Sequence, residues 1–286
     1  MNQIMKFSIL VLALFLVSCK DEPVTETPID NNTTDEAFLQ KVLVEKVASV
    51  NCGSCSLAQW ELEQLKDSLG DRFVYISNYL FGPLNHSHTD YLLEKADKTY
   101  FTPLAFVNRK EEGQGTVFYQ LYAWEEQVTA VLSQKADLGI GLSTSYQEEF
   151  INVNVLLSRK DLLGTDNRLH VFLLEKKVVG EGDGYDQRNY GNDDPEHPYY
   201  QQGEEIAGFE HKNILRSRLT DKDGYLIEWR ENDISVELSS AFTLADNKSL
   251  EDYSLVAFVA DGEIPNAGII LNTQQVSLGD SASMFE

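Results

Sequence analysis

Residues 42–55 read VLVEKVASVNCGSC, and this stretch decides the fold of the N-terminal half. Residues 42–50 are dense in Val and Leu at odd and even positions, which predicts a strand buried on both faces. The strand runs directly into Cys52-Gly53-Ser54-Cys55, and residues 57–69 (LAQWELEQLKDSL) then carry apolar side chains at helical spacing up to Gly70. The two cysteines are therefore predicted at a strand-to-helix junction.

The elements that follow alternate between strand and helix. They are predicted as a strand at 72–80, a polar helix at 87–99, a strand at 102–108 that opens with Thr102-Pro103, a strand at 116–122 and a helix at 123–135. This order predicts an α/β domain over residues 36–136.

The pattern changes after residue 136. Strand-like runs recur at 138–146, 150–158, 170–179, 234–238, 253–260 and 268–278, and several of them alternate apolar and polar residues. Short strands separated by turns predict an all-β antiparallel sandwich, Ig-like, over residues 137–286. A long segment of Gly, Asp, Asn, Tyr and Pro at 180–203 interrupts the strands, and loops of this length are commonly functional or mobile.

The N-terminus has the pattern of an export signal. Residues 1–6 hold one positive charge, residues 7–17 (FSILVLALFLV) are apolar but too few to span a bilayer, and Leu16-Val17-Ser18-Cys19 follows. This tetrapeptide matches the lipobox of bacterial lipoproteins, so residues 1–19 are predicted as a lipoprotein signal peptide and Cys19 as the lipidated first residue of the mature chain. A plain secretory signal or an uncleaved anchor is the alternative. Residues 20–35, rich in Thr, Pro, Asn and acid, are predicted to form a disordered tether.

Charge and cysteine content exclude several classes of protein. A formal net charge of −23 argues against nucleic acid and against docking by charge on an anionic bilayer, which leaves the lipid on Cys19 as the attachment to the membrane. Three cysteines are present, so Cys52 and Cys55 remain as a pair that is expected to form a disulfide outside the cytoplasm. No second Cys pair exists to complete a tetrahedral zinc site, and no metal or other cofactor is predicted.

Two interpretations of the cysteine pair are open. A thiol at a helix N-terminus is stabilised as thiolate, so Cys52 can act as the nucleophile of thiol–disulfide exchange and Cys55 as the resolving thiol. The alternative is a static disulfide that staples the start of the helix.

The order of these motifs resembles two known groups of proteins. A strand, a CxxC helix start, a second strand and Thr102-Pro103 resemble the thioredoxin fold, in which the residue matching Pro103 is a cis-proline packed against the disulfide. The longer pattern resembles the Omp28-related outer-membrane lipoproteins, and the similar segments are 41–45 before CGxC, 107–109 (VNR), 169–175 (LHVFLLE), 211–216 (HKNILR) and 255–259 (LVAFV). This resemblance implies an outer-membrane lipoprotein of the cell envelope. The tract 20–22 (KDE) resembles the one that follows the lipidated cysteine in surface-exposed lipoproteins of the Bacteroidetes group.

Three residues depart from the pattern of efficient thioredoxin-like catalysts. Asn51 stands where a Trp usually precedes the first cysteine, and Ser54 replaces the Pro of thioredoxin's own motif. Lys46, with Glu45 beside it, occupies the position of the buried acid that assists proton transfer.

Two functions follow. The first is a binding or adhesion module at the cell surface, with a protein or peptide partner contacting the sandwich and its long loop, and with Cys52–Cys55 as a staple. The alternative is an envelope thiol–disulfide oxidoreductase that uses Cys52, Cys55 and Pro103. In the 180–203 loop the acids are interpreted as solvated rather than as a calcium site, and the tyrosines as a recognition surface or as packing. His211 and Arg216 are interpreted as structural hydrogen-bonding residues.

Overall fold

The structure is a computed structural model that describes residues 38–95, 102–110, 121–160, 163–164, 166–262 and 268–285. All of these belong to one compact unit, Glu36–Glu286. The predicted signal peptide, its Cys19 and the tether lie outside the described residues. None of the helices within the described ranges has the length and apolar character needed to cross a membrane.

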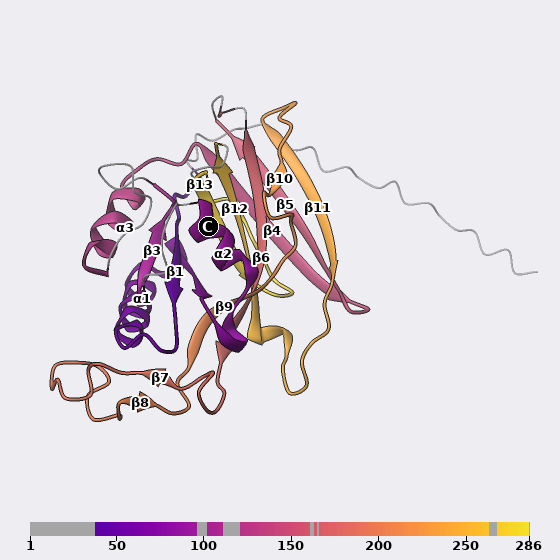
Figure 1. Cartoon of the computed structure of the whole chain (residues 1–286). Coiled ribbons are helices and arrows are strands. Elements are labelled where there is room, and N and C mark those ends of the chain that lie inside the picture. The colour runs from indigo at the N-terminus through magenta and orange to yellow at the C-terminus, as the bar shows by residue number, and fades with distance from the viewer. Residues whose placement is uncertain are drawn as a thin grey trace, which may run out of the picture. The chain divides into compact units, whose positions relative to one another are not determined.

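The N-terminal part contributes three strands to a larger sheet and has helices on both faces of them (Figure 1). Strand β1 (Val42–Ala48) runs parallel to β2 (Phe73–Tyr79) and antiparallel to β3 (Leu104–Val107). One face packs on α1 (Cys55–Leu69) and α3 (Trp124–Leu132), and the other packs on α2 (Ser87–Lys95). The predicted strand, helix and strand over 42–80 are confirmed, because an apolar run flanked by the CGSC turn and Gly70 leaves little ambiguity.

Two predicted elements of this part are only partly described. The helix predicted at 87–99 is described as α2, Ser87–Lys95. Most of the strand predicted at 116–122 lies outside the described residues, and its end belongs to a short 3₁₀ helix, Leu121–Ala123. Two further 3₁₀ turns, Gly70–Arg72 and Gly82–Leu84, flank β2.

The C-terminal part is a β-sandwich. A four-stranded sheet has the order β11-β5-β4-β14, and its strands span Asp233–Ala241, Phe150–Arg159, Leu138–Gln147 and Ser281–Ala282. It faces β6 (Asn167–Val178), β12 (Tyr253–Asp261) and β13 (Ile269–Ser277), which lie in a larger sheet. A 3₁₀ turn, Leu250–Asp252, precedes β12. The alternating residues of β5, such as Ile151 and Val155, fill the core between the sheets, as the period-two pattern predicts.

The larger sheet runs through both parts of the chain. Its order is β13-β12-β6-β9-β2-β1-β3, with β10 (Tyr225–Leu226) paired to β6. Strand β9 (His211–Arg218) lies between β6 and β2 and joins the two parts. The segments 36–136 and 137–286 therefore share one sheet. Their division into two domains stays a prediction. Strand β9 was not predicted because HKNILRSR lacks a clear apolar alternation.

The large sheet curls until its two ends meet. Asn108, just after the end strand β3, donates its side-chain amide to the carbonyl of Ile270 in β13, and the Ile270 N–H donates to the Asn108 carbonyl. Inside this curl, Leu43 and Ile76 pack against Phe172 and Phe258 from the sandwich strands. A small two-stranded ribbon of β7 (Gln187–Arg188) and β8 (Glu205–Ile206) lies apart from both sheets (Figure 1).

Candidate functional site

The two cysteines form the predicted disulfide at the start of α1. Cys52 and Cys55 are joined with a Cα–Cα distance of 5.4 Å. Cys55 is the first residue of the helix and is buried, whereas Cys52 lies in the preceding turn and is partly exposed. Cys55 packs in a cluster with Tyr79 of β2 and Ile214 of β9, and Cys52 contacts the same cluster. The more accessible sulfur thus belongs to the first cysteine.

Pro103 lies at the corresponding end of the neighbouring strand. The Thr102–Pro103 peptide bond is cis. The next residue, Leu104, begins β3 and pairs with Val47 near the end of β1. Pro103 is therefore placed at the edge of the sheet from which the CGSC turn departs.

A segment of the 180–203 loop, residues 187–190, lies across this turn, and we call it the strap. The Gln187 side-chain amide donates to the carbonyls of Val50 at 3.1 Å and Cys52 at 2.8 Å. The Arg188 N–H donates to the Val50 carbonyl at 2.8 Å. Gln187 is fully buried, so its amide replaces water at these two carbonyls; the Cys52 carbonyl also accepts from the Cys55 N–H at 3.1 Å within the turn. The strap therefore fixes the backbone that carries Cys52.

The strap also explains the glycine of the motif. The Tyr190 N–H donates to the Gly53 carbonyl at 3.1 Å, and a Cβ on Gly53 would lie 2.3 Å from the Tyr190 ring. That separation is far below contact distance, so only glycine fits beneath the ring. Tyr190 itself is 70% exposed, and the Arg188 guanidinium lies 5.5 Å from its ring centroid. The loop tyrosines were predicted either to form a recognition surface or to pack the loop. Tyr190 is exposed and also packs over Gly53.

Lys46 is buried beneath the same region. Its side chain is fully buried, and its Nζ has no hydrogen-bond partner among the residues that the structure describes. The ammonium lies 5.8 Å from the ring centroid of Tyr79. Burial lowers the pKa of Lys46 to about 7, against an opposing effect of the Glu63 carboxylate.

His211 connects Tyr79 to the loop that contains the strap. Its Nε2 lies 2.6 Å from the Tyr185 carbonyl, so Nε2 carries the proton, and Nδ1 accepts from the Tyr79 hydroxyl at 2.7 Å. Burial lowers the pKa of His211 to about 4, so the imidazole is neutral at pH 7. Arg216 donates to the Glu175 carboxylate at 2.8 Å and to the Pro83 carbonyl at 3.2 Å. Both residues make structural hydrogen bonds, as the sequence interpretation holds.

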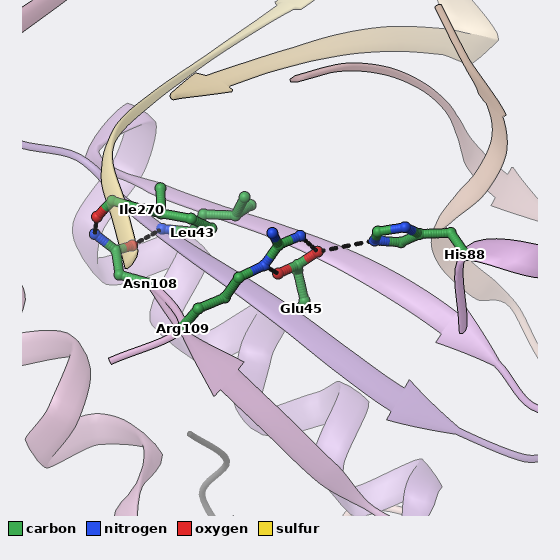
Figure 2. A network of polar contacts seen from close by, with 6 residues as sticks. All are labelled: Leu43, Glu45, His88, Asn108, Arg109 and Ile270. Atoms are coloured by element: carbon green, nitrogen blue, oxygen red, sulfur yellow. Dashed lines mark hydrogen bonds and ion pairs between the residues drawn. The ribbon is translucent and has the colours of Figure 1, made fainter. Parts of the chain in front are cut away.

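The opposite face of β1 holds a second polar group, shown in Figure 2. Glu45 accepts two hydrogen bonds from the Arg109 guanidinium, at 2.6 and 2.8 Å, and a third contact of 3.2 Å joins it to His88 Nε2. All three side chains are buried. Burial by itself would raise the pKa of Glu45, but Arg109 and His88 hold it at about 2.

The 107–109 motif holds this network in place. Asn108 and Arg109 have left-handed backbone conformations, with φ of 47° and 51°. This bend directs Arg109 onto Glu45 while the Asn108 carboxamide accepts from the Leu43 N–H at 2.7 Å (Figure 2). The motif thus secures β1 to β3 and β13, which is a structural role.

Sequence analysis did not assign roles to three residues of the site. Lys46 was noted only for its position, and the signal available was a charge in the middle of a strand predicted to be buried. Tyr79 and Gln187 gave no signal, because their partners are backbone carbonyls or residues distant in the chain.

Comparison with known proteins places the chain in a family. Residues 93–282 match the family described as "Outer membrane protein Omp28", and the chain belongs to this family. It is therefore an outer-membrane protein of the cell envelope, as predicted. The matched residues begin within α2, so Cys52 and Cys55 lie outside them.

The fold resembles that of a solved structure. HBP35 of Porphyromonas gingivalis is 16% identical, with a TM-score of 0.64 over 85% of this chain and 76% of that one, which shows a shared fold. A domain of the outer membrane lipoprotein Omp28 from Porphyromonas gingivalis is 19% identical over 50% of this chain and 89% of its own, and its TM-score of 0.32 carries no argument. No curated protein matches the chain.

Proposed function

We propose that this outer-membrane protein exchanges disulfides with proteins of the cell envelope through Cys52 and Cys55. The observation that carries the proposal is the difference in exposure between the two cysteines at one helix start. A partner can reach Cys52, whereas Cys55 is buried and can only resolve the bond from inside.

The surrounding elements support a thioredoxin-like α/β segment. The supporting features are a parallel β1–β2 pair, an antiparallel β3 preceded by a cis-proline, and helices on both faces. The positive end of the α1 dipole lies at Cys55, which favours the thiolate of the reduced pair.

The exchange balances as follows. The thiolate of a partner dithiol attacks Cys52 Sγ, the Cys52–Cys55 bond breaks, and the electron pair leaves on Cys55 Sγ. The partner's second thiolate then attacks the partner sulfur that is bonded to Cys52, and Cys52 leaves as a thiolate. The partner has become a disulfide and the protein a dithiol, with two electrons transferred; the reverse sequence oxidises a partner.

An exchange assay on the full chain tests this proposal. We expect wild-type protein to accelerate the reduction of insulin by dithiothreitol, and Cys52→Ser to abolish the acceleration. Cys55→Ser should instead accumulate a mixed disulfide with the substrate through Cys52. A wild-type rate equal to that of dithiothreitol alone would overturn the proposal.

A second candidate is a binding module, and one observation favours it. Tyr190 is 70% exposed on a strap that is fixed by several hydrogen bonds, and rigid exposed tyrosines are effective interface anchors. In this function the disulfide only staples the turn. Binding of envelope or host proteins that is retained by Cys52→Ser but lost in Tyr190→Ala would support this candidate over exchange.

The membrane attachment is proposed to be the lipid on Cys19, after cleavage of residues 1–19. The LVSC pattern and the family's place in the outer membrane support it. We expect labelled palmitate to be incorporated into wild-type protein, and Cys19→Ala to lose both the label and the membrane fraction. A Cys19→Ala protein that keeps its label would contradict the assignment.

A further inference from the structure

The Lys46 ammonium is an unusual group for this interior. Its side chain is fully buried, and no acceptor among the described residues lies within hydrogen-bonding distance of Nζ. A buried charge without a partner costs several kcal/mol, so such a group is normally replaced by an apolar one of the same size. Neighbouring Lys41, also buried, instead donates to the Gln274 side chain at 2.6 Å.

Lys46 lies next to the cluster that holds the disulfide. Its Nζ is 5.8 Å from the centroid of Tyr79, and Tyr79 packs in one buried cluster with Cys55. Strand β1 continues from Lys46 directly into the turn that carries Cys52. Lys46 therefore lies beside Tyr79, which packs in the cluster that contains the resolving cysteine.

The other groups that act on this lysine are few. They come from α1 (Glu63), β2 (Tyr79) and β9 (His211). Glu63 is already hydrogen-bonded to the Tyr75 hydroxyl, and His211 is neutral and engaged on both ring nitrogens. None of these groups supplies a fixed negative charge in contact with the ammonium.

We propose that Lys46 takes up one of the two protons that accompany reduction of the disulfide, so that the reduced site contains a Cys55 thiolate paired with the Lys46 ammonium. This inference rests on the proposed function and names the group that sets its redox equilibrium. A partner dithiol supplies two electrons and two protons. The electrons break the S–S bond, one proton goes to Cys52, and the other goes to the neutral Lys46 amine while Cys55 remains a thiolate. The partner leaves as a disulfide.

The pairing has a thermodynamic consequence that can be measured. In the oxidised protein no thiolate is present to pair with a protonated Lys46, whereas the reduced protein supplies the Cys55 thiolate. Lys46 therefore stabilises the dithiol form relative to the disulfide, because an opposite charge at short range favours both charged groups.

The test uses the full chain equilibrated at pH 7 with mixtures of reduced and oxidised dithiothreitol. Thiols are trapped and assigned by peptide mass, so that Cys52 and Cys55 are measured separately from Cys19. We expect Lys46→Met to lower the equilibrium constant for reduction at least tenfold, which is a potential about 30 mV more negative. Lys46→Gln should do the same, and Lys222→Met, which removes an exposed lysine, should match wild type.

A second readout separates this role from a structural one. The pH midpoint for alkylation of Cys55 should rise by at least one unit in Lys46→Met, because the thiolate loses its counter-ion. Equal equilibrium constants and equal alkylation midpoints in wild type and both Lys46 variants would overturn the inference. The dithiothreitol equilibrium needs no protein substrate, so failure of the insulin assay is a separate result that concerns only the proposed function.

Discussion

Two neighbouring residues of β1, Glu45 and Lys46, are both charged and both fully buried, yet their surroundings differ. On one face Arg109 and His88 surround the carboxylate of Glu45 with hydrogen bonds (Figure 2). On the other face the ammonium of Lys46 has no hydrogen-bond partner within the described part of the chain; it lies near the Tyr79 ring, and the Glu63 carboxylate acts on it without a hydrogen bond. A closed network of charges holds a fold together, whereas an unpaired buried charge costs stability and is expected where the chemistry requires it.

The largest change in stability is expected from removing the carboxylate of Glu45. Glu45→Gln leaves the Arg109 guanidinium buried without its carboxylate, and should lower the free energy of unfolding by about 3–5 kcal/mol. Urea denaturation of the full chain measures it. Asp71→Asn, which removes an exposed ion pair with Lys66, should change the same quantity by less than about 1 kcal/mol.

The stability difference between wild type and Glu45→Gln should depend on pH. Because the pKa of Glu45 is lowered to about 2, its contribution to stability is present above its ordinary pKa of 4.5 and is lost as the pH falls toward 2. Wild type should therefore lose more stability than Glu45→Gln between pH 4.5 and 2. Parallel profiles would contradict the assignment of the charge network.

A smaller change in stability, of opposite sign, is expected from removing the ammonium of Lys46. Lys46→Met removes an unpaired charge, and should stabilise the oxidised protein near neutral pH by about 2–4 kcal/mol. The pKa of Lys46 falls from 10.5 to about 7 on folding, so the unfolded chain binds more protons between these values and wild-type stability rises with pH there. The gain in Lys46→Met should shrink as the pH is raised from 7 to 10; a constant gain would show that the charge is not its cause.

The strap gives the third prediction. Gly53→Ala places a methyl group against the Tyr190 ring, and should destabilise the protein by about 1–3 kcal/mol. Tyr190→Ala in the same chain should recover most of that loss. A double-mutant cycle in thermal or urea denaturation measures the coupling, and additive effects would contradict the contact.

An effect of similar size is expected at Tyr79. Tyr79→Phe leaves His211 Nδ1 without its donor, and should cost about 1–3 kcal/mol. Because that bond favours the neutral imidazole, the pKa of His211 should also move up from about 4. Titration of the imidazole by NMR measures the shift, and Tyr253→Phe, at the edge of the sandwich core, serves as the control.

Local patterns in the sequence were enough for the elements near the cysteines. Residues 42–69 combine a dense apolar run, a CGSC turn and helical spacing, and each signal lies within a few residues of the next. The strands of the sandwich were predicted for the same reason, since residues such as Val153 and Val155 alternate with polar ones.

The long-range arrangement could not be predicted in this way. Strand β9 lies between β2 and β6 although its own residues are mostly half-buried and polar, and the curled sheet closes through Asn108 and Ile270, which are 162 positions apart. Glu45 and Lys46 gave a partial signal as charges within a buried strand. Which of them would find a partner depends on Arg109 and His88, and no pattern in residues 42–50 contains that information.

The strap also sets an order of events during synthesis. Gln187 follows Cys52 by 135 residues, so at about 5–20 residues per second it is synthesised roughly 7–27 seconds after the cysteine whose carbonyl it hydrogen-bonds. Until Gln187 has been made and has reached the CGSC turn, the strap's hydrogen bonds to Val50 and Cys52 cannot form. The cysteine pair therefore passes through two states of exposure: one before the strap covers the CGSC turn, and one in the finished protein, in which Cys52 is the more exposed of the two.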